Sequence, residues 1–355
     1  MRKFVPLPSR WAWPALLVAF VLAACGGTAP ASPSGAPSVP PKPASASPSA
    51  SAQLTKLTAS YSNISGSNLT FFVTKEGGYF EKNGLDVDLQ FISGGAKNMA
   101  ALVANQIQIG HVGGSELVSA NVEGADLISF ATLTPVFPYK FEAAPSIKTV
   151  QDLKGKPVGI SSIGGAVDIV TRLLFKKYGL DLDKDAIPVP DNGSEFRMQA
   201  LLGGATMAAM ADPPGLLQLE ANGFHSIANL AQERIPTSNA GVTASRAWVQ
   251  GHRDVVQKYI DALVQGTART KKDKAFSVNV LKKYFKSNDD KAMEVTYDFF
   301  ALDVAPAIPQ ITPEQFTDAV DILAKKNAKV KDWDVNKAID NSFVKSAADR
   351  GLDKA

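Results

Sequence analysis

Hydrophobic and polar residues alternate strictly over one short stretch of the chain. Leu85, Val87, Leu89 and Phe91 are separated by polar residues, and this period of two predicts a strand. Short apolar stretches predict further strands at residues 57–61, 108–112, 156–161 and 207–211. The segments that follow Gly/Ser/Asn-rich loops predict helices over 69–76, 98–105, 167–178 and 195–202. Strand, helix, strand, helix, strand is the order typical of a parallel α/β sheet.

This order of elements occurs twice, at an offset of 99 residues. The segment 94–102 aligns with 193–201, so that Met99, Ala101 and Leu102 fall on Met198, Ala200 and Leu201. A second pair of segments, 63–66 and 162–165, has the same offset. Ordered matches at one offset indicate two related structural units. The tail from Trp248 to Ala355 is mostly helical in pattern, and Thr312-Pro313-Glu314 is typical of a helix start.

The N-terminus has the pattern of an export signal. Arg2, Lys3 and Arg10 precede an apolar stretch at 11–22, which is too short to span a bilayer that needs about 20 apolar residues. The stretch ends in Leu22-Ala23-Ala24-Cys25, which is similar to a bacterial lipobox. We therefore expect residues 1–24 to be a lipoprotein signal peptide and Cys25 to be lipidated, which attaches the protein to a membrane without spanning it.

Composition narrows the remaining possibilities. Residues 25–53 are almost only Ala, Ser, Pro and Gly, which predicts a disordered tether because such a segment cannot offset its ordering entropy. Cys25 is the only cysteine, so an internal disulfide is excluded. The net charge is +3 and no dense Lys/Arg run occurs, and an export signal argues against a nucleic-acid partner.

The strand-to-helix loops are the candidate binding elements. In parallel sheets ligands bind beyond the carboxyl ends of the strands, where helix N-termini offer unpaired N–H groups and partial positive charge. Glycine lets a ligand approach the backbone, and Ser or Asn adds donors. The same loops could also hold only ordinary turn and N-cap residues. The expected ligand-binding residues are Ser65, Gly66, Ser67, Asn68, Gly94, Gly95, Gly113, Gly114, Ser115, Ser162, Gly164, Gly165, Asn192, Gly193, Ser194 and Asp212.

Several segments resemble a known family. They are K-E-G-G-Y-F-E-K-N-G-L-D-V-D-L at 75–89, G-G-A-K-N-M-A-A-L-V-A-N-Q-I-Q-I-G at 94–110, V-Q-D-L-K-G-K-P-V-G-I at 150–160 and L-F-K-K-Y-G-L at 174–180. Over residues 57–258 the chain resembles periplasmic substrate-binding proteins of ABC importers, in the branch that binds nitrate, taurine, alkanesulfonates and the pyrimidine precursor of thiamine.

The resemblance implies a two-lobed type II periplasmic-binding-protein fold, each lobe a mainly parallel sheet flanked by helices. Residues 54–141 would form the first part of lobe 1, 142–239 lobe 2, and 240–355 a mostly helical return to lobe 1, with hinge closure around the ligand. We expect a monomer that binds a small-molecule solute and delivers it to an ABC-importer permease. No cofactor, metal or catalytic residue is expected.

Alternative functions remain open at this stage. A related branch makes the thiamine pyrimidine and carries a cysteine-rich motif, which this chain lacks after Cys25. His111, His225 and His252 are far apart in sequence and show no metal-ligand spacing, although His111 could line the cleft. A sensor module on the same fold would need an attached signalling domain.

The ligand is expected to be a small anion of the sulfonate or carboxylate class, held by backbone amides. Arg197 is predicted to lie on a helix rather than in a binding loop. Tyr61, Phe137 and Tyr139 could stack on an aromatic ligand, but core and hinge packing is the simpler interpretation. A thiamine-pyrimidine-like ligand is the alternative.

Overall fold

The computed structural model describes residues 53–191 and 193–354. The predicted signal peptide, Cys25, nearly all of the predicted tether and Asn192 lie outside these described residues. Within the described part of the chain, no helix is both long and apolar enough to cross a membrane.

The first lobe is built on a five-stranded mixed sheet with the order β2-β1-β3-β10-β4. Its strands are β1 (Thr55–Tyr61), β2 (Leu85–Phe91), β3 (Ile109–Val112), β4 (Leu127–Thr132) and β10 (Gly241–Ser245). Only β10 runs against its neighbours. The helices between these strands are α1 (Leu69–Glu76), α2 (Tyr79–Lys82), α3 (Gly95–Val103) and α4 (Gly114–Val122).

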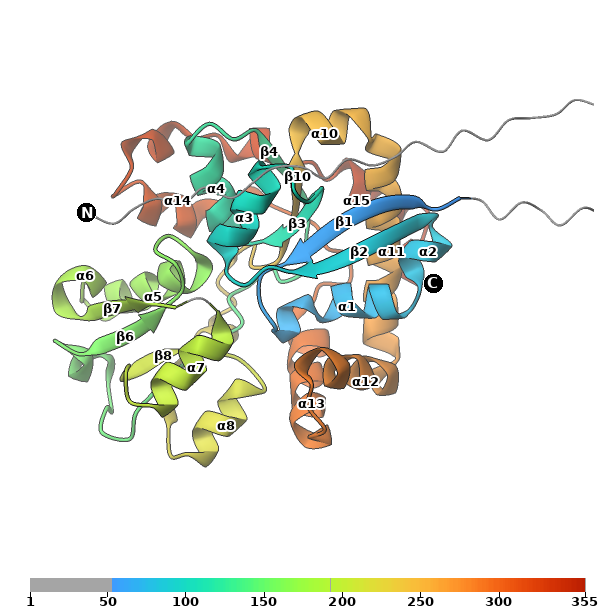
Figure 1. Cartoon of the computed structure of the whole chain (residues 1–355). Helices are drawn as coiled ribbons and strands as arrows, with labels where there is room; N and C mark the ends of the chain where they lie inside the picture. The colour runs from blue at the N-terminus through green and yellow to red at the C-terminus, as the bar shows by residue number, and fades with distance from the viewer. Residues whose placement is uncertain (1–52, 192, 355) are drawn as a thin grey trace, which may run out of the picture. The chain divides into compact units, whose positions relative to one another are not determined.

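The second lobe repeats this arrangement (Figure 1). Its sheet has the order β7-β6-β8-β5-β9, built from β5 (Lys140–Ala143), β6 (Pro157–Ile160), β7 (Ile187–Pro190), β8 (Ala208–Ala211) and β9 (His225–Asn229). The helices of this lobe are α5 (Ala166–Lys177), α6 (Leu182–Asp185), α7 (Ser194–Leu202), α8 (Gly215–Ala221) and α9 (Leu230–Glu233). In the second sheet β5 is antiparallel to its neighbours, as β10 is in the first, and the other strands of each sheet share one direction. Each reversed strand follows a segment that connects the two lobes.

Strand pairing preserves the sequence repeat residue by residue. Ser60 of β1 lies opposite Gly110 of β3, and Gly159 of β6 lies opposite Ala209 of β8, so both members shift by 99 residues. Helices α3 and α7 begin at positions with the same offset. The predicted α/β two-lobed fold is therefore confirmed, and the predicted elements appear with ends displaced by a few residues.

Two chain segments connect the lobes and pair with each other. The backbone N–H of Leu133 donates to Ala240 O at 3.0 Å, and that of Phe137 donates to Ile235 O at 3.2 Å. Val136 and Pro236 form an antiparallel bridge between the segments. Since β5 begins at Lys140 and belongs to the second sheet, the predicted lobe boundary at residue 141 falls inside that strand.

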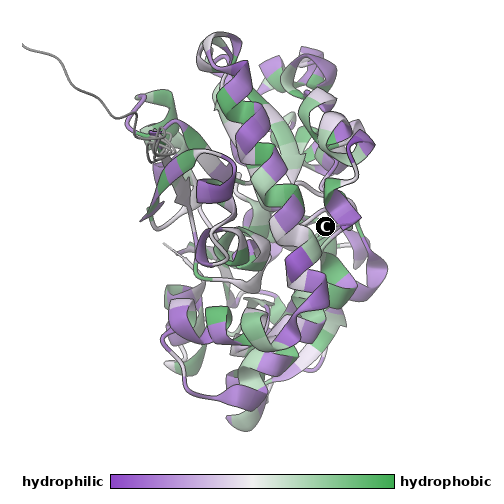
Figure 2. Cartoon of the chain, turned by 90° about the vertical axis from the view of Figure 1, so that its right-hand side faces the viewer, coloured by the Kyte–Doolittle hydropathy of each residue, from purple (hydrophilic) through white to green (hydrophobic). Residues whose placement is uncertain are grey.

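The C-terminal part of the chain, from Arg246 on, is helical and packs mainly on the first lobe. It contains α10 (Arg246–Gly251), α11 (Arg253–Lys272), α12 (Lys274–Phe285), α13 (Asp290–Tyr297), α14 (Thr317–Leu323) and α15 (Ser342–Asp349). Helix α11 packs on α1 and α15, and Figure 2 shows hydrophilic and hydrophobic residues alternating along the helices on this side, as expected when one face meets the core and the other meets solvent. Helix α14 contacts both α4 and α5, and its Ile322 belongs to the core of the second lobe.

Candidate functional site

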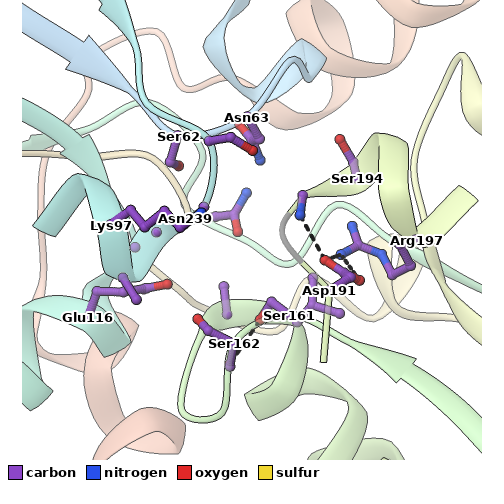
Figure 3. Close-up of a pocket in the computed structure, with 18 of the residues that line it drawn as sticks. Ser62, Asn63, Lys97, Glu116, Ser161, Ser162, Asp191, Ser194, Arg197 and Asn239 are labelled. Atoms are coloured by element: carbon purple, nitrogen blue, oxygen red, sulfur yellow. Dashed lines mark hydrogen bonds and ion pairs between the residues drawn. The ribbon is translucent and has the colours of Figure 1, made fainter. Parts of the chain in front are cut away.

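A polar cavity of about 170 Å³ lies where the strand-to-helix corners of the two lobes face each other (Figure 3). The first lobe contributes residues after β1 and at the starts of α3 and α4, and the second lobe contributes residues after β6, after β7 and at the start of α7. The crossing segments add Tyr139 and Asn239. The lining residues are Ser62, Asn63, Ser93, Gly94, Gly95, Ala96, Lys97, Gly113, Glu116, Tyr139, Ser161, Ser162, Ala166, Val167, Asp191, Gly193, Ser194, Arg197 and Asn239.

The expected ligand-binding residues divide into two groups. Those that line this cavity are Gly94, Gly95, Gly113, Ser162, Gly193 and Ser194. Those outside its lining are Ser65, Gly66, Ser67, Asn68, Gly114, Ser115, Gly164, Gly165 and Asp212. Asn192 lies outside the described residues. The structure thus brings corners of both lobes together, although it places only part of each corner at the cavity.

Residues 65–68, in the later part of the loop after β1, are turned into the protein, whereas Ser62 and Asn63 at its start line the cavity. Ser65 Oγ donates a hydrogen bond of 2.5 Å to Asp212 Oδ2 in the other lobe. Asn239 Nδ2 donates to Ser67 Oγ at 3.1 Å, which ties the loop to a crossing segment. A Cβ added to Gly66 would lie 2.0 Å from the ring of Phe300, so this ring packs directly against the loop. This loop holds the lobes and the crossing together.

Asp212 is a buried carboxyl at this junction between the lobes. Its residue is 8% exposed, and burial raises the pKa of its carboxyl to about 6, while the hydrogen bond from Ser65 and the charge of Arg197 partly offset that effect. Burial favours the neutral form of a carboxyl because the charged form loses its hydration. The group can therefore change its charge near neutral pH.

Lys97 supplies a cation to the cavity. It lies in the first turn of α3, and its ammonium group has no ion pair or hydrogen bond with another described residue. Figure 3 shows Lys97 and Glu116 on the same side of the cavity, carried by neighbouring helices of the first lobe. Neither Lys97 nor Glu116 was predicted, because the Gly/Ser/Asn pattern marks the loops and not the charged residues in the first turn of each following helix.

Glu116 supplies an anion to the same side. Its carboxylate accepts a hydrogen bond of 2.9 Å from Ser115 Oγ and another from the backbone N–H of Ala166, at the start of α5 in the other lobe. Burial raises the pKa of Glu116, and these hydrogen bonds partly counteract it. The carboxylate thus reaches from one lobe to a helix N-terminus of the other.

Arg197 and Asp191 form a buried ion pair on the second-lobe side. Arg197 Nη1 lies 3.1 Å and 3.3 Å from the two oxygens of Asp191, and Arg197 Nε donates to Met210 O at 2.9 Å. The two side chains are 6% and 8% exposed. Burial raises the pKa of Asp191, and Arg197 lowers it again in part. Arg197 lies on a helix, as predicted, but unlike the expectation it also lines the cavity.

The aromatic and histidine candidates lie mostly in the core. His111 stacks on Phe71 with ring centroids 3.7 Å apart, and its Nε2 lies 2.9 Å from Tyr259 Oη. Burial lowers the pKa of His111 to about 3, so the ring is neutral and part of the core. Tyr61 and Phe137 are buried in the same way. Tyr139 does line the cavity, with its hydroxyl hydrogen-bonded to Asn239 Oδ1 at 3.1 Å.

The described residues contain no group of three His, Cys, Asp or Glu side chains placed to hold a metal ion. The polar groups around the cavity are instead hydroxyls, amides, one unpaired cation, one carboxylate and one internal ion pair. Such a set can orient a small polar molecule by hydrogen bonds and charge.

Comparison with known proteins identifies the family. The model of the NMT1/THI5-like family matches residues 67–274, which is more than half of the chain. The riboflavin-binding protein RibY of Chloroflexus aurantiacus is 24% identical over 275 residues, covering 75% of this chain and 76% of that protein. The putative binding protein YtlA of Bacillus subtilis is 23% identical over 233 residues, covering 64% of this chain and 70% of that protein.

Solved structures share the fold. The alkanesulfonate-binding protein SsuA of Xanthomonas axonopodis pv. citri is 18% identical with a TM-score of 0.64, covering 83% of this chain and 98% of that chain. The periplasmic nitrate-binding protein NrtA of Synechocystis PCC 6803 is 13% identical with a TM-score of 0.67, covering 84% and 89%. The chain therefore belongs to the NMT1/THI5-like family of binding proteins and has the periplasmic-binding-protein fold.

Proposed function

We propose that this protein is the solute-binding lipoprotein of an ABC importer. It captures a small organic solute that carries an anionic group, of the sulfonate or carboxylate class, in the cavity between its lobes. It then delivers that solute to the membrane permease and does no chemistry on it. Family membership, and relatives and structural neighbours that are themselves named as binding proteins, support this function.

The single observation that carries the ligand class is Lys97. Arg197, the other cation of the cavity, is already paired with Asp191, so its charge is balanced within the protein. Lys97 has no such partner among the described residues, and it lines a concave site shared by both lobes. Lys97 is exposed to solvent at the cavity, and an anionic group on the solute would supply the partner for its charge.

An aromatic ligand such as a thiamine-pyrimidine-like compound is the second candidate, favoured by the similarity to a riboflavin-binding protein. Aromatic ligands are usually held between aromatic side chains. Tyr139 is the one aromatic residue among the described residues that line this cavity, and it is 4% exposed. The cavity therefore offers little ring surface for stacking, which is why we place the anionic solute first.

The N-terminal sequence supports export and anchoring. A basic start, a short apolar stretch and Leu22-Ala23-Ala24-Cys25 make up the proposed lipoprotein signal, with residues 25–53 as a tether that lets the binding lobes stand off the membrane. Substitution of Cys25 by Ser should release the protein from the membrane fraction of expressing cells.

The test is a ligand screen on the purified protein, read out as thermal stabilisation. Sulfonates, carboxylates, neutral pyrimidines and flavins are compared at matched ionic strength, because a ligand that binds only the folded state raises its melting temperature by mass action. We expect stabilisation by an anionic solute. That effect should fall by tenfold or more in affinity in Lys97→Gln, while the exposed helical control Lys291→Gln keeps it. A screen in which no solute stabilises the wild-type protein would contradict the proposed function.

A further inference from the structure

We propose that Glu116 determines specificity in this cavity: its carboxylate takes the anion position at the helix N-termini, so the solute's own anionic group is excluded there and a hydrogen-bond donor is required. This inference deepens the proposed function and rests on it. It reverses the role that the sequence pattern predicted for the glycine-rich corners, which was to hold the ligand's anion directly.

The glycines of three corners are shaped around this carboxylate. A Cβ added to Gly95 would lie 2.3 Å from Glu116 Oε1, and one added to Gly113 would lie 2.3 Å from Oε2. From the other lobe, a Cβ on Gly165 would lie 3.1 Å from Oε1, although Ser161 Oγ at 2.7 Å and Ser162 O at 3.0 Å would be nearer. Any larger residue at the first two positions would meet the carboxylate. The absence of a side chain at Gly95 and Gly113 is therefore explained by Glu116 itself.

The same position has the electrostatics of an anion site. Helices α3, α4 and α5 begin at Gly95, Gly114 and Ala166, and each N-terminus carries partial positive charge and unpaired N–H groups. One of those groups, the N–H of Ala166, already donates to Glu116. A carboxylate held there neutralises the field that would otherwise attract a sulfonate, a carboxylate or an inorganic anion.

Glu116 nevertheless remains available to a ligand. It lines the cavity and is only partly buried, whereas Ser115, which donates to it, is 5% exposed and outside the lining. A carboxylate oxygen has room for about two hydrogen bonds, so two oxygens can accept from the protein and still accept from a ligand. An N–H or ammonium group of the solute fits this position, and its anionic group fits Lys97.

The experiment measures sulfate and methanesulfonate binding by isothermal titration calorimetry at constant ionic strength. Glu116→Gln keeps the shape and removes the charge, Glu116→Asp keeps the charge, and Glu294→Gln is an exposed control on α13. We expect Glu116→Gln to bind these anions at least tenfold more tightly than the wild type. Glu116→Asp and Glu294→Gln should remain like the wild type. Circular dichroism confirms folding, and Glu116→Ala serves the same comparison if the glutamine variant is unfolded.

A second pair of probes tests the donor requirement. Propionate and β-alanine share a carboxylate, and only β-alanine adds an ammonium group. We expect Glu116→Gln to shift the ratio of their affinities toward propionate by at least tenfold. Unchanged anion affinity and an unchanged ratio, with Lys97-dependent solute binding intact, would overturn the role of Glu116 and leave the proposed function standing. Failure of every solute on the wild type and on all variants would instead contradict the proposed function.

Discussion

Asn98 in the first lobe and Arg197 in the second occupy the same place in the repeat, yet only Arg197 reaches the cavity. Asn98 is fully buried, and its Oδ1 accepts a hydrogen bond of 2.9 Å from Ser60 Oγ on the neighbouring strand. Arg197 extends past its strand and pairs with Asp191. The two helices and the two sheets are otherwise arranged alike.

The cause of this difference lies on the strand beneath each helix. The residue that corresponds to Ser60 is Gly159, and a Cβ there would lie 3.3 Å from Arg197 Cγ and 3.0 Å from Ala209 Cβ. Glycine therefore leaves the space through which the arginine stem passes. Arginine in place of asparagine supplies the charge at the cavity, and glycine on the strand beneath it leaves room for the arginine stem.

The largest effect is expected from Arg197→Asn, which gives the second lobe the residue of the first. Asp191 would then remain buried without its partner, and breaking a buried ion pair costs about 3–5 kcal/mol of unfolding free energy. Urea unfolding measures the loss. The double variant with Asp191→Asn should recover part of it, because the two residues act as a pair.

Arg246→Met is the matched control for that variant. Its ion pair with Asp126 lies at the surface, with side chains 30% and 69% exposed, so its removal should cost less than about 1 kcal/mol. Equal losses for Arg197→Asn and Arg246→Met would mean that the buried pair has no special role in the second lobe.

Asp212 and its repeat counterpart Gly113 provide the next comparison. Because the folded-state pKa of Asp212 is about 6, above its ordinary value of 3.8, the folded protein binds the extra proton more readily. Stability should therefore fall as pH rises from about 4 to about 6, by roughly 3 kcal/mol for a shift of this size. Above that range the full cost of the buried charge remains.

Asp212→Asn should remove this dependence. The amide oxygen can still accept from Ser65, and the neutral side chain carries no charge to bury. We expect the difference in unfolding free energy between pH 4 and pH 6.5 to shrink in the variant, and the variant to be the more stable protein at pH 8. Parallel stability curves for both proteins would contradict a titrating Asp212.

Gly159→Ser makes the strand of the second lobe like that of the first and should have the smallest effect of the three. The added atoms would press on Arg197 and Ala209, and overpacking of this kind costs about 1–3 kcal/mol. Solute binding should weaken as well, because Arg197 must shift within the cavity. Unchanged stability and affinity in thermal unfolding and titration would show that the space above Gly159 is not needed. In the first lobe, Ser60→Ala removes only the hydrogen bond from Ser60 Oγ to Asn98 and should cost about 1 kcal/mol.

Much of the fold could be predicted because it depends on local patterns. The alternation at 85–91 predicted both ends of β2 correctly, and the segment 69–76 predicted both ends of α1 correctly. The start of α3 was placed three residues late because Gly94 and Gly95 were assigned to a loop, although Gly94, with φ of 90°, is the residue that allows the chain to turn into the helix.

The candidate site was predictable only in outline. The rule that ligands bind beyond the carboxyl ends of strands placed Gly94, Gly113, Gly193 and Ser194 at the right edge of each sheet. It could not separate these from Ser65, which has the same composition and the same topological position but is bonded to Asp212 across the lobes. The loop at Ser65 and the loops at the cavity differ in the residues that pack on them. Contacts with residues far apart in sequence cannot be predicted from the local pattern.

The sequence by itself determined the order of strands and helices, the repeat of 99 residues and the N-terminal export pattern, because periodicity, turn residues and hydrophobic runs are properties of neighbouring residues. Only the tertiary structure decided which polar groups share the cavity. Lys97 and Glu116 line the cavity together with corners of the second lobe that are more than 40 residues away in the chain, and Glu116 occupies the glycine-lined position that the pattern had suggested for a ligand. The charge and the free space at a site depend on every element that packs there, and the packing of the two lobes decides which elements those are.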